Sequence, residues 1–240
     1  MTKPGALIIG ASSLIGTAIG SALVRDGAAV VGVSLEASSH PEFLTTLRAD
    51  CSDSGEADRV VAEALGVLGS IDIVVLAAAA MPVASAADTT DELWRRAMGA
   101  TLDSAFFVVR AALPHLGRGA AIVAVSSSNA RTTVPGIPGY AAAKAGLEGL
   151  VRQLAVEYGP RGIRVNAVAP GMIGSADLPQ VAEGYPLGRT GTPEDVAEAV
   201  AFLTSNRSTF ITGAVLPVDG GLTIGSPAAW LRPDLRKRWQ

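Results

Sequence analysis

The sequence has little of what several classes of protein need. It contains one cysteine, Cys51, and only two histidines, His40 and His115, among 240 residues. A single cysteine excludes an internal disulfide framework and fits a reducing cytoplasm. With so few histidines and no clustered thiols, the chain also lacks the usual ligands of a structural zinc site. We therefore expect a cytoplasmic protein that binds no metal.

Charge and long apolar runs are scarce too. Charged residues make up 17% of the chain and the net charge is -3, which gives no electrostatic reason to expect nucleic acid or an anionic membrane as a partner. The longest uncharged apolar stretch, residues 73–81, is far shorter than the roughly 20 residues of a membrane span, and the N-terminal apolar run is too short for a signal peptide. Apolar residues are abundant, at 49%, so the chain can bury the core of one large α/β domain.

Short β-branched runs alternate with longer helical periods along the chain. This pattern indicates βαβ units around a parallel sheet with helices on both faces. A long helical pattern runs from Thr90 to Leu113 and ends at Pro114, and Thr192 followed by Pro193 predicts the start of a later helix. The long connection over residues 169–191 is expected to be a functional loop, such as a lid. The expected strands are Ala6–Ile9, Ala28–Val33, Leu47–Ala49, Ile71–Leu76, Ala120–Val125, Arg164–Val168 and Val215–Val218.

A glycine-containing turn follows the first expected strand and opens a helix, over residues 10–16. Such a turn lets backbone N–H groups and the positive end of the helix face a pyrophosphate, although a tight connection alone would look the same. Asp50, at the end of the third strand, could accept a hydrogen bond from an adenine amino group or be a solvated turn residue. No acid stands at Ser34, where the second strand ends, and no lysine or arginine is near it in the sequence, while Glu36 would repel a phosphate. These features favour NAD(H) over NADP(H).

Three residues in the middle of the chain suggest proton chemistry. Ser127 follows the strand that ends at Val125, and Tyr140 comes thirteen residues later. Lys144 lies four residues beyond the tyrosine, one turn along the same face of the expected helix. A nearby ammonium stabilises a phenolate and lowers the pKa of the phenol from about 10, and a serine hydroxyl can hold a substrate oxygen. A Tyr–Lys pair at this spacing is also common in ordinary helices.

The motifs become specific when they are taken together. The turn from Gly10 to Gly16, Asp50, Ser127, Tyr140 with Lys144, the segment 166–171 (Asn-Ala-Val-Ala-Pro-Gly) and the segment 218–221 (Val-Asp-Gly-Gly) resemble, in order and spacing, the short-chain dehydrogenase/reductase (SDR) family. The resemblance covers about residues 5–224. It implies a three-layer, Rossmann-type, doubly wound parallel sheet of about seven strands in a single domain. We expect this domain over residues 1–225, with a C-terminal extension over 226–240.

The resemblance also implies a function and a set of site residues. The expected enzyme is an NAD(P)(H)-dependent oxidoreductase that interconverts a ketone and a secondary alcohol. Tyr140 would be the general acid/base, Lys144 would lower its pKa and bind the nicotinamide ribose, and Ser127 would orient the carbonyl. Thr101 occupies the position of the asparagine that completes the family's proton relay. The expected cofactor-binding residues are Gly10, Ser12, Ser13, Leu14, Ile15, Gly16, Ser34, Asp50, Cys51, Ala77, Ala78, Tyr140, Lys144, Pro170, Gly171 and Ile173.

Four departures from the family pattern keep alternatives open. Leu14 replaces the middle glycine of the turn, residues 76–79 (Leu-Ala-Ala-Ala) replace Asn-Asn-Ala-Gly, Thr101 replaces asparagine, and Ser175 represents the usual threonine after Pro-Gly. One alternative is a degenerate nucleotide-binding or regulatory protein of the same fold. Another is a non-redox enzyme that uses the tyrosine and serine for elimination or isomerisation.

The substrate and assembly are expected from the remaining segments. A short lid over residues 172–185 and an apolar lining predict a neutral small-molecule ketone or alcohol as substrate. The C-terminal residues 226–240 form either an arm that crosses to a neighbouring subunit or a surface tail. A homotetramer or homodimer is expected because the family commonly forms oligomers. The expected apolar lining is Met81, Val134, Ile137, Met172 and Leu178.

Overall fold

Seven parallel strands form one sheet in the computed structural model of the chain, which describes residues 3–239. Their order is β3-β2-β1-β4-β5-β6-β7. The order changes direction between β1 and β4, and in open α/β sheets ligands bind beyond the carboxyl ends of the strands at such a point. The predicted α/β fold with a doubly wound parallel sheet is therefore confirmed. The strands are β1 (Gly5–Ile9), β2 (Ala29–Ser34), β3 (Thr45–Arg48), β4 (Ile73–Leu76), β5 (Ala121–Val125), β6 (Arg164–Pro170) and β7 (Val215–Val218).

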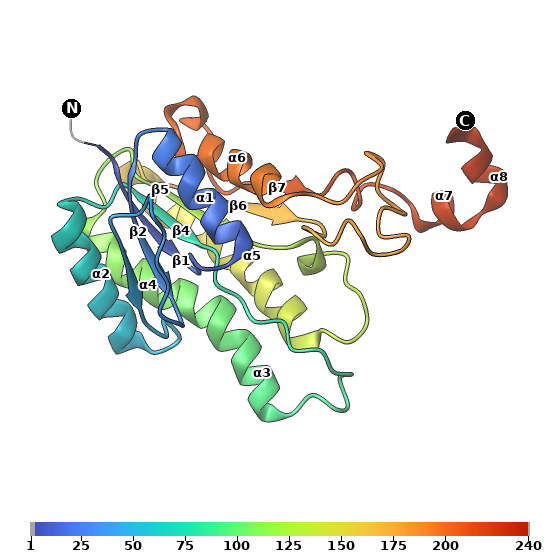
Figure 1. Cartoon of the computed structure of the whole chain (residues 1–240), viewed down its shortest axis with the longest axis horizontal. Coiled ribbons are helices and arrows are strands. Elements are labelled where there is room, and N and C mark those ends of the chain that lie inside the picture. Colours follow the sequence, from blue (N-terminus) through green and yellow to red (C-terminus); the bar gives the residue numbers. More distant parts are fainter. Residues whose placement is uncertain (1–2, 240) are drawn as a thin grey trace.

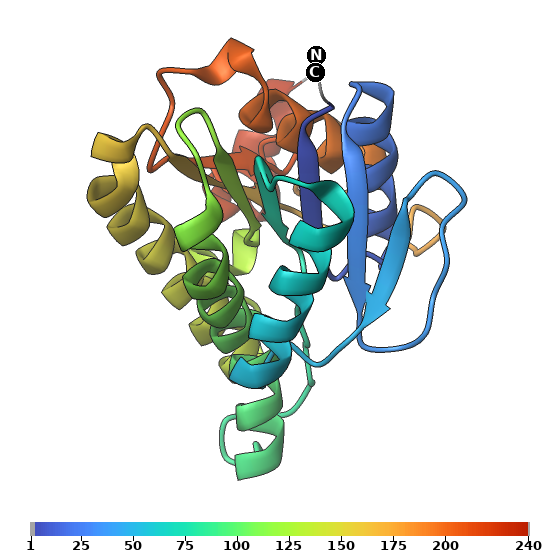
Figure 2. The same cartoon turned by 90° about the vertical axis from the view of Figure 1, so that its left-hand side faces the viewer.

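Helices cover both faces of this sheet (Figures 1 and 2). On one face α2 (Ser54–Leu68), α4 (Ser104–Ala112) and α5 (Pro138–Tyr158) bury their apolar residues against the strands. On the other face α1 (Leu14–Arg25) and α6 (Pro193–Thr204) form a second apolar core. The central strands β1, β4 and β5 are buried along their whole length, which explains why their sequences are continuous apolar runs.

Polar side chains fix where several helices begin. The Ser13 side chain accepts a hydrogen bond from the Gly16 N–H at the start of α1, and Asp53 caps α2 in the same way. At α6 the Thr192 side chain and the N3 carboxylate of Asp195 form a reciprocal capping box, with proline at the first helical position. The helix start predicted at Thr192 is confirmed.

The long helix expected over residues 90–113 is present but is not uniform. It comprises α3 (Asp91–Met98), a π-helical segment (Gly99–Asp103) and α4, and it passes into a 3-10 turn at Leu113–His115. One extra residue in the π-helical turn rotates the helix locally, and such turns occur often at functional sites. Thr101 lies in the middle of this segment. The remaining 3-10 turns are Ser128–Ala130, Gly159–Arg161, Asn206–Ser208 and Lys237–Trp239.

Two segments lie outside the layers. The connection from β6 to α6 contains no helix and carries two non-glycine residues with positive φ, Ser175 and Gln180. After β7 the chain forms two short helices, α7 (Pro227–Leu231) and α8 (Pro233–Arg236), which extend away from the sheet at the right of Figure 1. Within residues 3–239, no helix is long and apolar enough to cross a bilayer. The ends of the two expected regions, residues 1, 2 and 240, lie outside the described residues.

Candidate active site

The turn between β1 and α1 needs glycine at both of its ends. Gly10 has a φ of +86°, and a Cβ there would lie 2.6 Å from the backbone nitrogen of Ala78. A Cβ at Gly16 would lie 2.2 Å from the carbonyl oxygen of Gly10. The turn is thus packed directly on the chain that follows β4. It leaves the N-terminus of α1 facing the cleft at the sheet edge, where backbone N–H groups and the helix dipole favour an anion.

Leu14 does not line this cleft. The residue is 76% exposed and borders a separate groove between α1 and α6, together with Ser21 and Glu198. The Leu14 side chain therefore does not fill the part of the cleft next to the β1–α1 turn. The departure from the family glycine leaves the approach to the turn open.

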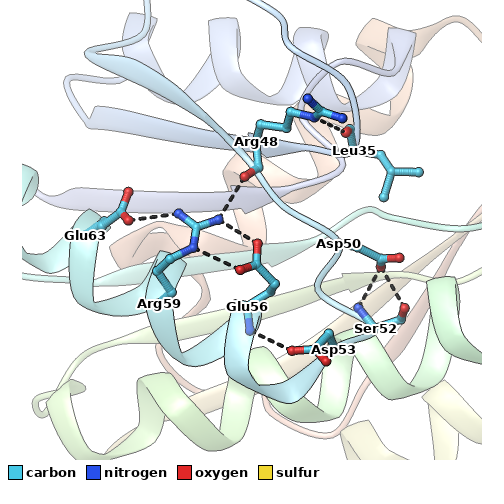
Figure 3. Close-up of polar contacts among 8 residues, drawn as sticks. All are labelled: Leu35, Arg48, Asp50, Ser52, Asp53, Glu56, Arg59 and Glu63. Carbon is cyan, nitrogen blue, oxygen red and sulfur yellow. Dashed lines mark hydrogen bonds and ion pairs between the residues drawn. The ribbon is translucent and has the colours of Figure 1, made fainter.

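The tips of β2 and β3 form the far end of the cleft, and Figure 3 shows their polar contacts. Asp50 Oδ1 accepts hydrogen bonds from the backbone nitrogen (2.9 Å) and the hydroxyl (2.7 Å) of Ser52. Cys51 beside it is buried, and this burial raises the pKa of its thiol to about 12. Arg48 reaches the carbonyl oxygen of Leu35 with its Nε at 3.3 Å. No arginine is near Ser34 in the sequence, but strand pairing brings one to the end of β2 from β3.

Ser127, Tyr140 and Lys144 meet in the middle of the cleft. Tyr140 and Ser127 both line the cleft, and Ser127, in the turn after β5, lies close enough to the tyrosine to lower its pKa. Lys144 lies one turn further along α5 and is 2% exposed. Its Nζ donates a hydrogen bond to the carbonyl oxygen of Val125 at 2.5 Å and lies 5.6 Å from the centre of the Tyr140 ring. The spacing in the sequence therefore corresponds to a real cluster at the carboxyl end of β5.

Burial changes the acid–base properties of this cluster. It lowers the pKa of Lys144 to about 7, because the ammonium loses its water. Burial also raises the pKa of Tyr140, and the nearby Ser127 hydroxyl opposes that rise only in part. The direction at Tyr140 is opposite to the expected lowering by Lys144. The physical reason is that desolvation of the phenolate is the largest influence on this group.

A buried carboxylate supports the serine turn from behind. Glu148 on α5 accepts a hydrogen bond from the Ser126 hydroxyl (3.1 Å) and forms an ion pair with Arg131 (3.1 Å). The side chain of Glu148 is 5% exposed, and Arg152 lies 3.9 Å away on the next turn. Nothing in the sequence motifs pointed to Glu148, since a glutamate on a helix usually faces solvent.

Thr101 is buried but does not line the cleft. It is 1% exposed, and its Oγ1 has no hydrogen-bond partner within the described part of the chain. Ala100 in the π-helical segment and Ser104 at the start of α4 do line the cleft. The threonine hydroxyl therefore lies just behind the cleft wall.

The cleft has a volume of about 970 Å³ and brings most of the expected residues together. Leu14, Gly16 and Thr101 are the expected site residues that do not line it. Leu178 does not line it either and is 51% exposed, so its expected place in the apolar wall is wrong. The expected residues that line it are Gly10, Ser12, Ser13, Ile15, Ser34, Asp50, Cys51, Ala77, Ala78, Met81, Ser127, Val134, Ile137, Tyr140, Lys144, Pro170, Gly171, Met172 and Ile173.

Tyr185 is a lining residue that the sequence did not reveal. Its hydroxyl accepts a hydrogen bond from the Met172 N–H at 2.8 Å, and the residue is buried. A Cβ at Gly171 would lie 3.1 Å from the same hydroxyl. Tyr185 thus ties the end of the lid to the strand end at Pro170. A tyrosine in a loop without secondary structure carries no periodic signal that would have predicted this contact.

Comparison with known proteins identifies the class. A family model described as enoyl-(acyl carrier protein) reductase matches residues 10–223. An uncharacterised oxidoreductase of Schizosaccharomyces pombe is 37% identical over 92% of this chain and 91% of its own length. An L-rhamnose 1-dehydrogenase (NAD(P)(+)) of Azotobacter vinelandii is 35% identical, over 91% of this chain and 96% of its own length. A crystal structure of a blue fluorescent protein from a metagenomic library, in complex with NADPH, has a TM-score of 0.87 and 30% identity, over 92% of this chain and 98% of that one.

The chain therefore belongs to the short-chain dehydrogenase/reductase family. It is an oxidoreductase of the NAD(P)-dependent kind that acts on the alcohol/carbonyl pair. The resemblance read from the six motifs is confirmed.

Proposed function

We propose that this enzyme interconverts a ketone and a secondary alcohol, with Tyr140 as the general acid/base. The observation that carries the proposal is the meeting of Tyr140, Ser127 and Lys144 in one cleft, with the Ser127 hydroxyl close enough to the tyrosine to affect its pKa. Two hydroxyl groups arranged in this way can bind one carbonyl oxygen from two directions and give it a proton.

The residues at the other end of the cleft fit a nicotinamide dinucleotide. At Gly10 a side chain would collide with the backbone at Ala78, and the capped start of α1 at Ser13 offers unpaired N–H groups for a pyrophosphate. When bound, the cofactor supplies or accepts the hydride. The residues proposed to hold it are Gly10, Ser12, Ser13, Ile15, Ser34, Asp50, Cys51, Ala77, Ala78, Tyr140, Lys144, Pro170, Gly171 and Ile173.

Side chains of this protein would transfer the proton to and from the substrate oxygen. In the reducing direction Ser127 donates a hydrogen bond to the substrate oxygen and Tyr140 transfers its phenolic proton to that oxygen. Because burial raises the pKa of Tyr140, the phenol is protonated at neutral pH and ready for this step. In the oxidising direction Tyr140 must lose its proton first, and the charged form of Lys144 stabilises the phenolate.

Thr101 is proposed to supply a water site for proton exchange. Its Oγ1 is buried without a partner in the described residues, and a buried hydroxyl of this kind is usually satisfied by ordered water. The π-helical turn around Thr101 provides the local irregularity in which such a water can bind. The threonine would then act on Tyr140 and Lys144 through water.

The wall of the cleft supports a small, neutral substrate. Met81, Val134, Ile137 and Met172 line it, and neither Asp177 nor Glu183 of the lid does. Such a wall suits an uncharged ketone or alcohol better than a phosphorylated compound, since burying an unpaired charge is costly. The similarity to an L-rhamnose 1-dehydrogenase supports a small, uncharged substrate that bears a hydroxyl group.

The decisive test is the Tyr140→Phe variant. It keeps the ring and removes the proton donor, so we expect turnover of a carbonyl and alcohol panel to fall by about a hundredfold or more. Nicotinamide fluorescence titration with NADH and NADPH should show cofactor binding within about twofold of the wild type, a margin below 0.5 kcal/mol. Tyr158→Phe, at the far end of the same helix, is the matched control and should keep full activity.

Two results would contradict this proposal. Turnover by the Tyr140→Phe variant at the wild-type rate would remove tyrosine from the chemistry. Failure of the wild-type protein to bind either cofactor would favour a non-redox use of the cleft.

We also propose that the protein works in the cytoplasm as a homodimer or homotetramer. The single buried cysteine fits a reducing compartment. The exposed Leu231 of the C-terminal segment, and Ile224 just before that segment, fit contact with a second copy of the chain.

A further inference from the structure

The pairing of β2 with β3 sets an arginine beside the end of β2. Ser34 and Arg48 are register partners in this parallel ladder, so both side chains project from the same face of the sheet. Adjacent strands are about 4.8 Å apart, well within the reach of an arginine side chain. Figure 3 shows the guanidinium of Arg48 lying against the carbonyl oxygen of Leu35, the residue after Ser34. Ser34 and Leu35 both line the cleft.

Arg48 has unused hydrogen-bonding capacity. Its Nε donates to Leu35, whereas its Nη1 and Nη2 have no partner in the part of the chain that the structure describes. It also forms no ion pair with a described carboxylate. Its neighbour Arg59 is different, because it is held by Glu56 at 2.7 Å, by Glu63 at 2.8 Å and by the carbonyl oxygen of Arg48 (Figure 3). Arg48 is therefore the arginine of this cluster that remains available to an anion.

The other groups at this strand end are hydroxyls. The Ser34 hydroxyl is 3.3 Å from the hydroxyl of Ser38, and no carboxylate occupies the end of β2. In dinucleotide-binding folds an acid at this position accepts the hydrogen bond of a free ribose 2′-hydroxyl, while an arginine nearby accommodates a 2′-phosphate. Two hydroxyls and a guanidinium are donors that suit a phosphate. Asp50 on the same strand end turns its Oδ1 to Ser52, and Glu36 is solvent-exposed.

We infer that Arg48 is a specificity residue that binds the 2′-phosphate of the adenosine ribose together with Ser34, so that the enzyme prefers NADP(H). The preference for NAD(H) that the sequence favours is thereby reversed. The reason lies in the pairing, because Arg48 is fourteen positions from Ser34 along the chain and adjacent to it in the sheet. The inference rests on the proposed function only in that the cleft binds a nicotinamide dinucleotide.

Two small ligands isolate the 2′-phosphate. Adenosine 2′,5′-bisphosphate and adenosine 5′-monophosphate differ in that group alone, and isothermal titration calorimetry measures their affinities without turnover. We expect the wild-type protein to bind the bisphosphate about tenfold or more tightly than the monophosphate, as one charge-assisted contact allows. The Arg48→Gln variant should lose this preference and bind the monophosphate as the wild type does.

Arg59→Gln is the matched control, since it removes a neighbouring guanidinium that is already paired with carboxylates. It should leave the ratio of the two affinities unchanged. Equal binding of both ligands by the wild type, or an unchanged ratio in Arg48→Gln, would overturn the inference and leave the proposed function standing. Binding of neither ligand would overturn both.

Discussion

Lys144 is a buried lysine, although a charged ammonium prefers contact with water. A lysine side chain is rarely fully buried, yet this one is 2% exposed, and within the described residues its hydrogen bond goes to the neutral carbonyl of Val125. No carboxylate of residues 3–239 offsets the loss of water, so the lowered pKa, about 7, follows from burial alone. An ammonium that titrates near neutral pH can change its charge during a catalytic cycle, which an ordinary lysine cannot.

This lowered pKa makes stability depend on pH in a defined window. Between about pH 7 and pH 10 the unfolded lysine holds its proton and the folded one has lost it, so the unfolded state binds more protons. The free energy of unfolding of the wild type therefore rises with pH in this window, by at most about 1.4 kcal/mol per pH unit from this group. Below pH 7 the lysine is protonated in both states and contributes no slope. Urea unfolding of the cofactor-free protein from pH 6.5 to 9.5 measures the slope.

The Lys144→Met variant should lose this part of the pH dependence. The side chain remains long and apolar, so the buried site stays filled. Lys237→Met, in the C-terminal segment, is the control and should keep the wild-type slope. Identical slopes for the wild type and Lys144→Met would mean that the buried lysine titrates at its ordinary pKa.

At the scale of elements, the β1–α1 turn is the most constrained connection in the site. Gly10 combines a positive φ with a close approach to the backbone of Ala78, two requirements that only glycine meets together. Gly27, after α1, has a similar φ of +96°, but a Cβ there would meet nothing within 4 Å. The two glycines therefore separate the cost of backbone strain from the cost of collision.

We predict unequal effects of alanine at these two positions. Gly27→Ala should cost about 1 kcal/mol of unfolding free energy, the usual cost of a positive φ in alanine. Gly10→Ala should cost about 2 kcal/mol more than that, because the turn must move away from Ala78. Gly10→Ala should also weaken NADH and NADPH binding, which Gly27→Ala should not. If urea unfolding gives the same loss of unfolding free energy for both variants, the turn moves away from Ala78 at no energetic cost and the prediction is wrong.

The elements also show what the sequence could and could not predict. The strands were predictable because they are buried on both faces and therefore read as apolar runs, as in β1 and β5. The capping box at Thr192 was predictable because its signals lie within four residues. The π-helical turn at Gly99–Asp103 was not, since its sequence continues the same helical period. Arg48 and Tyr185 were missed because each meets the site through a tertiary contact with no local signature.

At the scale of the whole molecule, the family resemblance rested on the order and spacing of the motifs. The sheet explains this order, because it brings the separated motifs together in space. Parallel strands place every carboxyl end at one edge, so residues as far apart as Gly10, Ser127 and Pro170 line one cleft. The proposed assembly is not encoded in this way. It depends on which surfaces remain apolar after folding. The C-terminal segment, which carries the exposed Leu231, extends away from the sheet (Figure 1).

The C-terminal helices contribute nothing buried to the domain. Neither α7 nor α8 has a buried residue, and Leu231 at the end of α7 is 80% exposed. An exposed leucine on this arm adds nothing to the stability of a single chain. Its burial against a second copy of the chain would be favourable. We therefore expect the arm to stabilise the oligomer and to leave the fold of each chain unaffected.

A chain ending at Gly225 tests this directly. Light scattering after size exclusion should give the full-length protein a mass of two or four chains, and the shortened chain a smaller assembly with unchanged far-ultraviolet circular dichroism. Leu231→Asp should reduce the assembly in the same way, because a charge in a buried contact is unpaired. Leu44→Asp, at a site that is 59% exposed outside the arm, should not. If the shortened chain and Leu231→Asp both keep the full-length mass, the arm is a surface tail, and the contacts between subunits must come from the helices and strands of the domain itself.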